Sequence, residues 1–361
     1  MKQTNELNGE QKPKKSINPL KITAIVLSTL AIVLVLAALG IGFLLWYSGG
    51  LRDSMFSSKD NAVSQQTEQD ALVDADWVDE DGNAYNFRDD VISILLMGID
   101  YMDRAEIFWD EGMESHGGNA DMLGLVILDT NTFEFSILYI PRDTMADMIA
   151  MDAEGNYIDT IRDNICTAHS YGDGKELSCQ LTADAVSRLL MGAPVNRYAA
   201  LHCDAIYTLN EILGGVRITF DSDCTDLHYT FTTGNTVTLN NLYLSMLVTY
   251  RDYADVDGAY VRGMRIMNVL KAMFNQLKGS IMEDPAVALE IVSKLSSYLT
   301  TDLEVAEITY LARNIGKMDF SSDTIVRLQG ETVMGEEYAE FHADPEWIHD
   351  FVVEKFCVPA Q

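Results

Sequence analysis

An unbroken apolar segment, residues 22–47, is the strongest constraint that this sequence places on its own structure. The segment is 26 residues long and contains no charged side chain. A helix needs about 20 apolar residues to cross a bilayer, and the apolar stretch of a cleaved signal peptide is usually about half as long as this one. The segment ends in Trp46 and Tyr47, which are typical of a membrane interface. Because it is apolar all round, it is predicted to be an uncleaved transmembrane helix and not a core helix.

The charges that flank this segment predict its orientation. Five lysines precede it, whereas Arg52 and Lys59 are the nearest basic residues after it. The positive-inside rule therefore predicts a cytoplasmic tail at residues 1–21 and an extracellular remainder. Residues 48–90 are polar and are predicted to form an extracellular stalk, with a small edge element at most. The globular domain is expected at residues 91–356, outside the cell membrane.

The overall charge excludes one large class of partner. Lys and Arg number 25 against 55 Asp and Glu, a formal net charge of −30, so a broad basic face for nucleic acid is not expected.

The cysteine count is five, and no CxxC pair occurs. Neither a zinc site nor a full disulfide framework is therefore predicted. Two alternatives stay open, a single bridge with Cys166–Cys179 as the pair closest in sequence, or free buried thiols.

Apolar runs of strand length predict the fold of the domain. Three of them lie at residues 91–97, 123–129 and 133–140, and the short polar turn between the last two predicts a hairpin. Continuous apolar runs are typical of strands that are covered on both faces. Helical patterns then alternate with strand patterns, so one α/β domain is predicted, an α/β/α sandwich with a central mixed sheet. Helices are expected at 181–191, 204–213, 239–251, 260–277, 285–299, 303–315 and 346–356, and strands at 198–203, 216–220 and 324–330.

Charged residues gather where the predicted strands end. Pro141 ends the third run, because it cannot donate to a strand ladder, and Arg142 and Asp143 follow it directly. Asp100 follows the first run, and Asp121 precedes the second. Ligands of open α/β sheets bind in crevices at strand ends. We therefore expect Asp100 and Asp121 to lie close to Arg142.

A second basic group occurs far downstream, at Arg251, Arg262 and Arg265. The last two are three residues apart, which places them on one face of a helix. A guanidinium group binds phosphate oxygens through two parallel hydrogen bonds. Mg²⁺ is commonly shared between carboxylates and substrate phosphates. A phosphate site with a metal is one interpretation, and ordinary structural ion pairs are the other.

Four stretches of the sequence, in order, resemble the LytR-CpsA-Psr family of bacterial cell-envelope proteins. They are ILLMGID, NADMLGLVILDTNT, LYIPRDTM and TYRDYADVDGAYVRGMR. The segment ALHCDAIYTLNEILGGVRITF is similar to the strand, helix and Gly-Gly pattern of the same family. The resemblance covers about residues 91–356.

The resemblance implies a function at the cytoplasmic membrane. Members transfer a glycan phosphate from a polyprenyl-pyrophosphate-linked donor to peptidoglycan and release polyprenyl phosphate. Asp100 and Asp121 would correspond to the acidic positions associated with Mg²⁺ (or Mn²⁺), and Asp143 would orient Arg142. The lipid tail would lie in an apolar groove between sheet and helices. The pyrophosphate would be held by Arg142, Arg251, Arg262 and Arg265.

Three positions depart from the family pattern. Asn119 and Tyr253 stand where arginines are usual, and Ile266 follows Arg265 in place of glutamine. Two functions are therefore weighed, an active glycan phosphotransferase and a degenerate polyprenyl-phosphate-binding or scaffold protein. A transcriptional regulator is disfavoured by the predicted topology. If other cations compensate for the missing arginines, Arg104 and Arg162 are the candidates.

Overall fold

The computed structural model describes residues 75–100 and 117–360, with the exception of 285 and 337. These residues belong to one compact unit, Arg52–Gln361. The predicted cytoplasmic tail, the predicted transmembrane helix, the first part of the predicted stalk and the loop that contains Arg104 lie outside the described residues. None of the helices in the described ranges is long and apolar enough to cross a membrane.

A mixed six-stranded sheet forms the centre of the unit, with the strand order β11-β8-β3-β4-β5-β12. β3 pairs antiparallel with β4, and β4 pairs antiparallel with β5, which confirms the predicted hairpin. β8 is parallel to β3, and β12 is parallel to β5. The strands are β3 (Val91–Ile99), β4 (Ala120–Asp129), β5 (Phe135–Ile140), β8 (Arg197–His202), β11 (Leu299–Thr301) and β12 (Ile325–Arg327).

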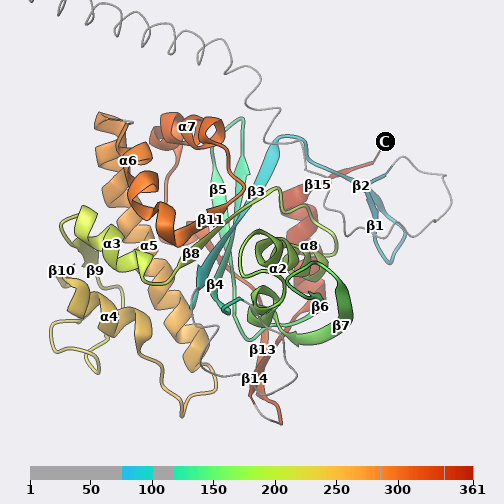
Figure 1. Cartoon of the computed structure of the whole chain (residues 1–361), viewed down its shortest axis with the longest axis horizontal. Coiled ribbons are helices and arrows are strands. Elements are labelled where there is room, and N and C mark those ends of the chain that lie inside the picture. The colour runs from blue at the N-terminus through green and yellow to red at the C-terminus, as the bar shows by residue number, and fades with distance from the viewer. Residues whose placement is uncertain (1–74, 101–116, 285, 337, 361) are drawn as a thin grey trace, which may run out of the picture. The chain divides into compact units, whose positions relative to one another are not determined.

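Helices cover both faces of this sheet, as the continuous apolar strands predict (Figure 1). On one face, Leu95, Leu125 and Leu138 belong to a core that includes residues of α2 (Glu176–Leu189) and α8 (Pro345–Phe356). On the other face, residues of the same strands pack against α5 (Gly258–Glu283) and α7 (Val305–Asn314). The prediction of an α/β sandwich around a mixed sheet is confirmed.

A separate small core lies beside α5, on the side of the molecule where α3, α4, α5 and α6 gather (Figure 1). It is formed by the β9–β10 hairpin, α4 and α5. α3 ends before Gly214 and Gly215, whose φ angles of 68° and 96° favour glycine. The elements are α3 (Ala205–Ile212), β9 (Val216–Thr219), β10 (Thr236–Leu239), α4 (Asn241–Thr249) and α6 (Ala286–Leu295).

Several elements were not predicted from the sequence. Two are hairpins, β6–β7 and β13–β14, and one is a three-stranded sheet in which β1 and β2, from the last part of the predicted stalk, pair with β15 at the C-terminal end. Four short 3₁₀ helices complete the described part of the chain. These elements are β1 (Trp77–Val78), β2 (Ala84–Phe87), β6 (Met145–Met151), β7 (Tyr157–Asn164), β13 (Gly330–Met334), β14 (Ala339–Ala343), β15 (Cys357–Pro359), η1 (Ile165–Ser170), η2 (Ser296–Tyr298), η3 (Ile315–Lys317) and η4 (Ser322–Thr324).

One glycine lets α5 lie directly on the sheet. A Cβ atom at Gly263 would overlap the side chain of Tyr139 on β5, a ring that is only 2% exposed. The backbone of α5 therefore approaches β5 more closely than any other residue would allow. This contact positions the N-terminal part of α5 over the C-terminal end of β5. The five cysteines all lie in the described ranges and are free, so no bridge forms, and three of them (Cys166, Cys179 and Cys357) are buried as the second alternative has it.

Candidate functional site

The turn after β5 presents Arg142 and Asp143 from a backbone that is held on two sides. Pro141 ends the strand as predicted. The N–H of Cys166 donates to the carbonyl oxygen of Arg142 at 3.2 Å, and the N–H of Phe341 donates to that of Asp143 at 2.7 Å. Because residues of η1 and β14 both donate to this turn, the backbone from which the two charged side chains extend is held in place.

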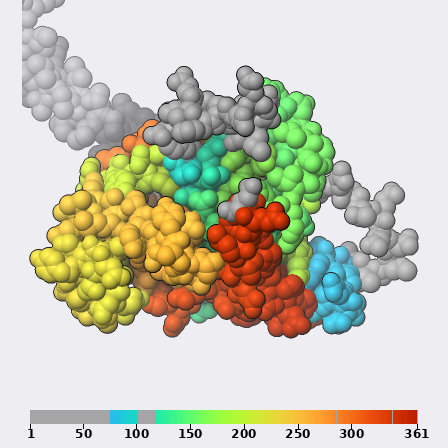
Figure 2. Space-filling view, turned by 90° about the horizontal axis from the view of Figure 1, so that it is seen from below, coloured from blue at the N-terminus to red at the C-terminus, as the bar shows by residue number. Residues whose placement is uncertain are grey.

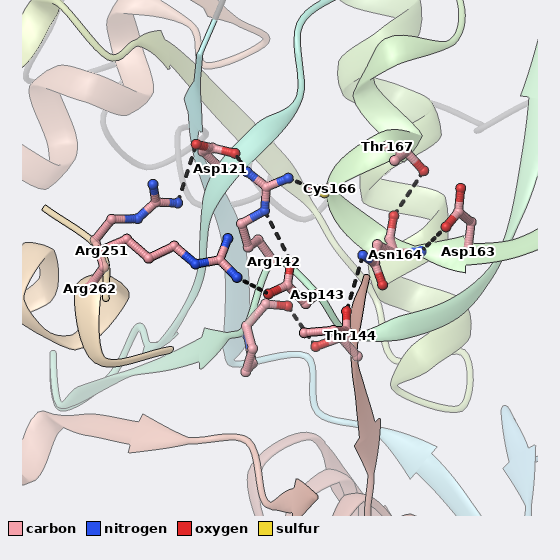
Figure 3. A network of polar contacts seen from close by, with 12 residues as sticks. Asp121, Arg142, Asp143, Thr144, Asp163, Asn164, Cys166, Thr167, Arg251 and Arg262 are labelled. Carbon is pink, nitrogen blue, oxygen red and sulfur yellow. Dashed lines mark hydrogen bonds and ion pairs between the residues drawn. The ribbon is translucent and has the colours of Figure 1, made fainter. Parts of the chain in front are cut away.

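Arg142 is the centre of a network of polar contacts (Figure 3). Its guanidinium forms an ion pair with Asp121 at the start of β4, and its Nε donates to Asp143 Oδ1 at 3.2 Å. Its Nη2 donates to the Sγ atom of Cys166 at 3.3 Å. Burial raises the pKa of the Cys166 thiol to about 11, so the thiol is protonated and uncharged at neutral pH. The side chain of Arg142 retains 21% exposure.

Two arginines from distant parts of the sequence join this network. Arg262 on α5 donates from Nη2 to Asp121 Oδ2 at 3.3 Å. Arg251, just after α4, has its Nη2 atom 4.0 Å from Asp143 Oδ2. Figure 3 shows both side chains extending toward the two aspartates. We call the three arginines with Asp121 and Asp143 the arginine cluster.

The cluster contains hydrogen-bond donors that the described residues leave unsatisfied. The Nε atoms of Arg251 and Arg262 are buried and have no acceptor among these residues, and the same holds for Arg265. A buried unpaired donor costs about 1–3 kcal/mol, and more when the group is charged. With three positive charges against two negative ones, the cluster offers its spare donors to an anion. The sequence-predicted residues Arg142, Arg251, Arg262, Asp121 and Asp143 are thus brought together.

Arg265 has different contacts from the other three arginines. Its Nη2 donates to the carbonyl oxygen of Tyr250, and its guanidinium carbon lies 5.5 Å from the centre of the Tyr250 ring. It lines a cavity between β9 and α5. Within the described part of the chain, no ion pair joins Arg265 to Asp121 or Asp143.

Asp100 lies beside Asp121 through a shared neighbour. The backbone N–H groups of both aspartates donate to the carbonyl oxygen of Asn119, at 3.1 and 3.0 Å. Asp100 Oδ1 accepts the N–H of Asn119 at 2.7 Å, and Asn119 Oδ1 accepts the hydroxyl of Ser170 at 2.7 Å. The side chain of Asn119 therefore connects the start of β4 to η1. The structure thus pairs Asp121 with Arg142 and places Asp100 beside Asp121.

The two aspartates fit a cation only in a limited way. Among the residues that the structure describes, no three His, Cys, Asp or Glu side chains are grouped to hold a metal. Asp100 Oδ2 has no hydrogen bond or ion pair with any described residue, whereas both oxygens of Asp121 contact guanidinium groups. Two carboxylates suit Mg²⁺ when substrate phosphates supply further oxygen ligands. The donor set thus fits a metal that binds together with a phosphate.

The remaining sequence candidates lie at the margin of the site or away from it. Tyr253 is 87% exposed, and the Arg251 guanidinium carbon lies 5.3 Å from its ring centre. Arg162, on β7, pairs with Asp147 at 3.0 Å, and both side chains are largely exposed. No described contact brings Arg162 to the arginine cluster. In the space-filling view, the start of β4 is seen between α5 and the β6–β7 region (Figure 2).

Two neighbours of the site were missed from the sequence. Cys166 contacts Arg142 as described, and the Nδ1–H of His169 donates to the carbonyl oxygen of Gly118 at 2.9 Å. The His169 ring is 1% exposed, and burial lowers its pKa below the ordinary value. Cys166 and His169 belong to no motif with a recognisable spacing, so only the fold shows that they lie next to the site.

Comparisons with known proteins give relatives for part of the sequence and for the fold. A stretch of 167 residues, 45% of this chain, is 28% identical to the "Polyisoprenyl-teichoic acid--peptidoglycan teichoic acid transferase TagU" of Halalkalibacterium halodurans, and the match spans only 46% of that relative. Among solved structures, TagV of B. subtilis has 21% identity and a TM-score of 0.54, covering 73% of this chain and 96% of its own. A structure of TagT bound to LI-WTA has 20% identity and a TM-score of 0.53, covering 73% of this chain and 89% of its own.

Protein gbs0355 from Streptococcus agalactiae has 17% identity and a TM-score of 0.56, covering 73% of this chain and 87% of its own. At these identities, the three structures establish the fold alone. A model of the LytR_cpsA_psr family matches residues 53–348, which is most of the sequence. The chain therefore belongs to the LytR_cpsA_psr family.

Proposed function

We propose that this protein transfers a phosphate-linked glycan from a polyprenyl-pyrophosphate donor to peptidoglycan, at the arginine cluster. The observation that carries the proposal is the set of buried Nε–H donors without acceptors on Arg251 and Arg262, beside the partly exposed Arg142. Family membership supports it, and so does the relative TagU, whose name describes a transferase to peptidoglycan.

The arginines bind the pyrophosphate and stabilise its departure. An acceptor hydroxyl oxygen forms a bond to the phosphorus that carries the glycan, the bond from this phosphorus to the bridging oxygen breaks, and polyprenyl phosphate leaves. Fixed guanidinium groups stabilise the charge that develops on the leaving phosphate. Asp121 and Asp143 hold these groups in place before the donor arrives.

The proton of the acceptor hydroxyl needs a carboxylate to receive it. Both carboxylate oxygens of Asp121 contact guanidinium groups, so neither is open to an acceptor hydroxyl. Asp100 Oδ2 has no such contact among the described residues. Asp100 Oδ2 is therefore the open carboxylate oxygen of the pair, available to receive the proton or to bind the cation.

A divalent cation, Mg²⁺ or Mn²⁺, would be held by Asp100 and Asp121 together with pyrophosphate oxygens. It would supply positive charge against the phosphates and thereby lower the repulsion between donor and acceptor. The two aspartates would orient it from the ends of adjacent strands, β3 and β4.

The site is proposed to work on the outer side of the cytoplasmic membrane, where the donor lipid is anchored. The lysines at residues 1–21 and the apolar segment 22–47 support this orientation. Protease added to intact protoplasts should digest the domain after Tyr47. Complete protection of this domain would overturn the orientation.

A binding protein without turnover is the second candidate. Asn119 and Tyr253 contribute no guanidinium group to the cluster, and the Asn119 side chain is engaged by Ser170. The double variant Asn119→Arg with Tyr253→Arg tests this directly. A large gain in transfer would mean that the natural pocket is depleted of cations, and would favour the second candidate.

The deciding experiment measures binding and transfer on the same preparation. The full chain in lipid nanodiscs is given a radiolabelled polyprenyl-pyrophosphate disaccharide and peptidoglycan, with Mg²⁺ or with excess chelator. We expect binding, and transfer that needs the metal. Binding without transfer in any metal would select the second candidate, and absence of binding would overturn both.

A further inference from the structure

A cavity with several basic residues in its lining lies next to the arginine cluster. It has a volume of about 360 Å³ and is lined by residues of β9, the segment that follows β9, α4 and α5. This volume is within the range of small-molecule sites, about 300–1,000 Å³. Its lining contains the basic residues Arg217, Arg265 and Lys271 but only one acidic residue, Asp221. The chain as a whole has 55 acidic and 25 basic residues. The lining of this cavity therefore has a net charge of the opposite sign to that of the chain.

The basic groups of this cavity are not neutralised by carboxylates. The buried Nε of Arg265 has no acceptor among the described residues, and burial, as the largest cause, lowers the pKa of its guanidinium. The side chain of Arg217 forms no ion pair with any residue that the structure describes, and Lys271 Nζ donates to the neutral hydroxyl of Ser322 at 3.0 Å. An anion would satisfy donors that the described part of the protein leaves open.

The cavity and the arginine cluster are connected through two short segments. Arg262 of the cluster and Arg265 of the cavity are three residues apart on α5, a rise of about 4.5 Å along the helix axis. Arg265 also donates to the carbonyl of Tyr250, the residue before Arg251 of the cluster. The cavity and the arginine cluster are therefore neighbours along α5.

We propose that this cavity is a second anion subsite, which binds an anionic group, phosphate or carboxylate, carried by the glycan while the arginine cluster binds the pyrophosphate. The identity of the ligand rests on the proposed function, whereas the anion preference rests on the lining alone. The lining combines apolar side chains such as Phe220 and Leu247 with polar ones, and Asn268, Asn275 and Gln276 add amide groups to the charged residues. The subsite would favour donors whose glycan is itself anionic.

Calorimetric titration of the full chain in nanodiscs of zwitterionic lipid tests the subsite. The probes are glucose 1-phosphate, glucuronate, inorganic phosphate and, as the neutral control, glucose. We expect two glucose 1-phosphate sites in the natural protein. Arg217→Gln combined with Lys271→Gln should weaken one of them by about tenfold for each charge removed. Arg142→Ala should remove only the other site. Arg313→Gln removes an exposed arginine of α7 and should keep both.

The outcomes separate this inference from the proposed function. One site that is lost in Arg142→Ala and unchanged in the cavity variants overturns the subsite and leaves the proposed function intact. One site that is lost only in the cavity variants supports the subsite and counts against pyrophosphate binding at the cluster. Equal binding of glucose overturns the anion preference, and equal binding of inorganic phosphate overturns recognition of the glycan. A preference between glucose 1-phosphate and glucuronate identifies the anionic group.

Ligand-dependent protection of β9 from hydrogen exchange gives a second readout that needs no variant. Glucose 1-phosphate should slow exchange at Val216–Thr219, and glucose should not. No difference between the two probes at saturating concentration would overturn the subsite.

Discussion

The contact between Gly263 and Tyr139 yields a prediction whose size follows from the structure. In Gly263→Ala, the new Cβ would overlap the Oη and Cζ atoms of Tyr139 and would lie 2.9 Å from its Cε2 atom. The ring cannot move aside, because it is 2% exposed and packs among Met122, Ile137 and Met267. Overpacking of this kind costs about 1–3 kcal/mol. Three close contacts with a ring place the cost near the upper value.

Alanine also stabilises a helix relative to glycine, by about 1 kcal/mol. The net destabilisation of Gly263→Ala should therefore be about 2 kcal/mol. Gly279→Ala on the same helix is the matched control, because a Cβ there would meet no heavy atom of the described structure within 4 Å. It should stabilise by about 1 kcal/mol. The two variants should thus differ by about 3 kcal/mol, which is the clash alone.

Urea unfolding of the full chain, followed by far-UV circular dichroism, measures this difference. Adding Tyr139→Phe to Gly263→Ala removes the Oη atom and should recover part of the loss. Pyrophosphate-lipid binding should weaken in Gly263→Ala, because a shift of α5 moves Arg262 away from Asp121. If Gly263→Ala proves as stable as Gly279→Ala, then α5 does not rest on β5 as described and the reasoning is refuted.

Three further predictions concern the site. Arg142→Ala should weaken binding of the pyrophosphate lipid by about ten- to a hundred-fold, since a charged hydrogen bond contributes about 1.5–3 kcal/mol, and an unchanged dissociation constant would contradict its role. Asp100→Asn should reduce transfer and raise the Mg²⁺ concentration needed for half-maximal rate, and a wild-type metal dependence would argue against a ligand role. Burial lowers the pKa of His169. Below about pH 6.5, His169 therefore binds a proton more readily in the unfolded chain than in the folded chain, and the free energy of unfolding should fall. Chemical unfolding at pH 7.5 and 5.5 should show a smaller loss in His169→Gln, and equal losses would disprove this.

Local sequence determines much of the central sheet and the helices that cover it. The apolar runs predict β3, β4 and β5 because unbroken hydrophobic strands must be covered on both faces. The polar turn between β4 and β5 closes a hairpin, and Pro141 ends β5 because it cannot donate to a ladder. Each of these signals acts within a few residues, so the sequence alone suffices.

Other elements depend on partners that local sequence does not reveal. β6 (MADMIAM) is rich in Met and Ala, which favour helices, yet it is extended because it pairs with β7. β2 and β15 come from opposite ends of the described chain, so no local signal links the two strands that pair. Tertiary contacts override local preference in both cases.

The candidate site divides in the same way. The sequence identifies Arg142 and Asp143 at the end of a strand, and it identifies Arg262 and Arg265 as neighbours on one helix. Only the tertiary structure separates these last two, with Arg262 paired to Asp121 and Arg265 lining the cavity beside β9. The physical reason is the rotation of side chains around the helix axis. Three residues along an α-helix turn by about 300°, so the side chains of Arg262 and Arg265 differ by about 60° in direction. Where α5 rests on the sheet, at Gly263, decides which guanidinium reaches an aspartate that is 141 residues away in the sequence.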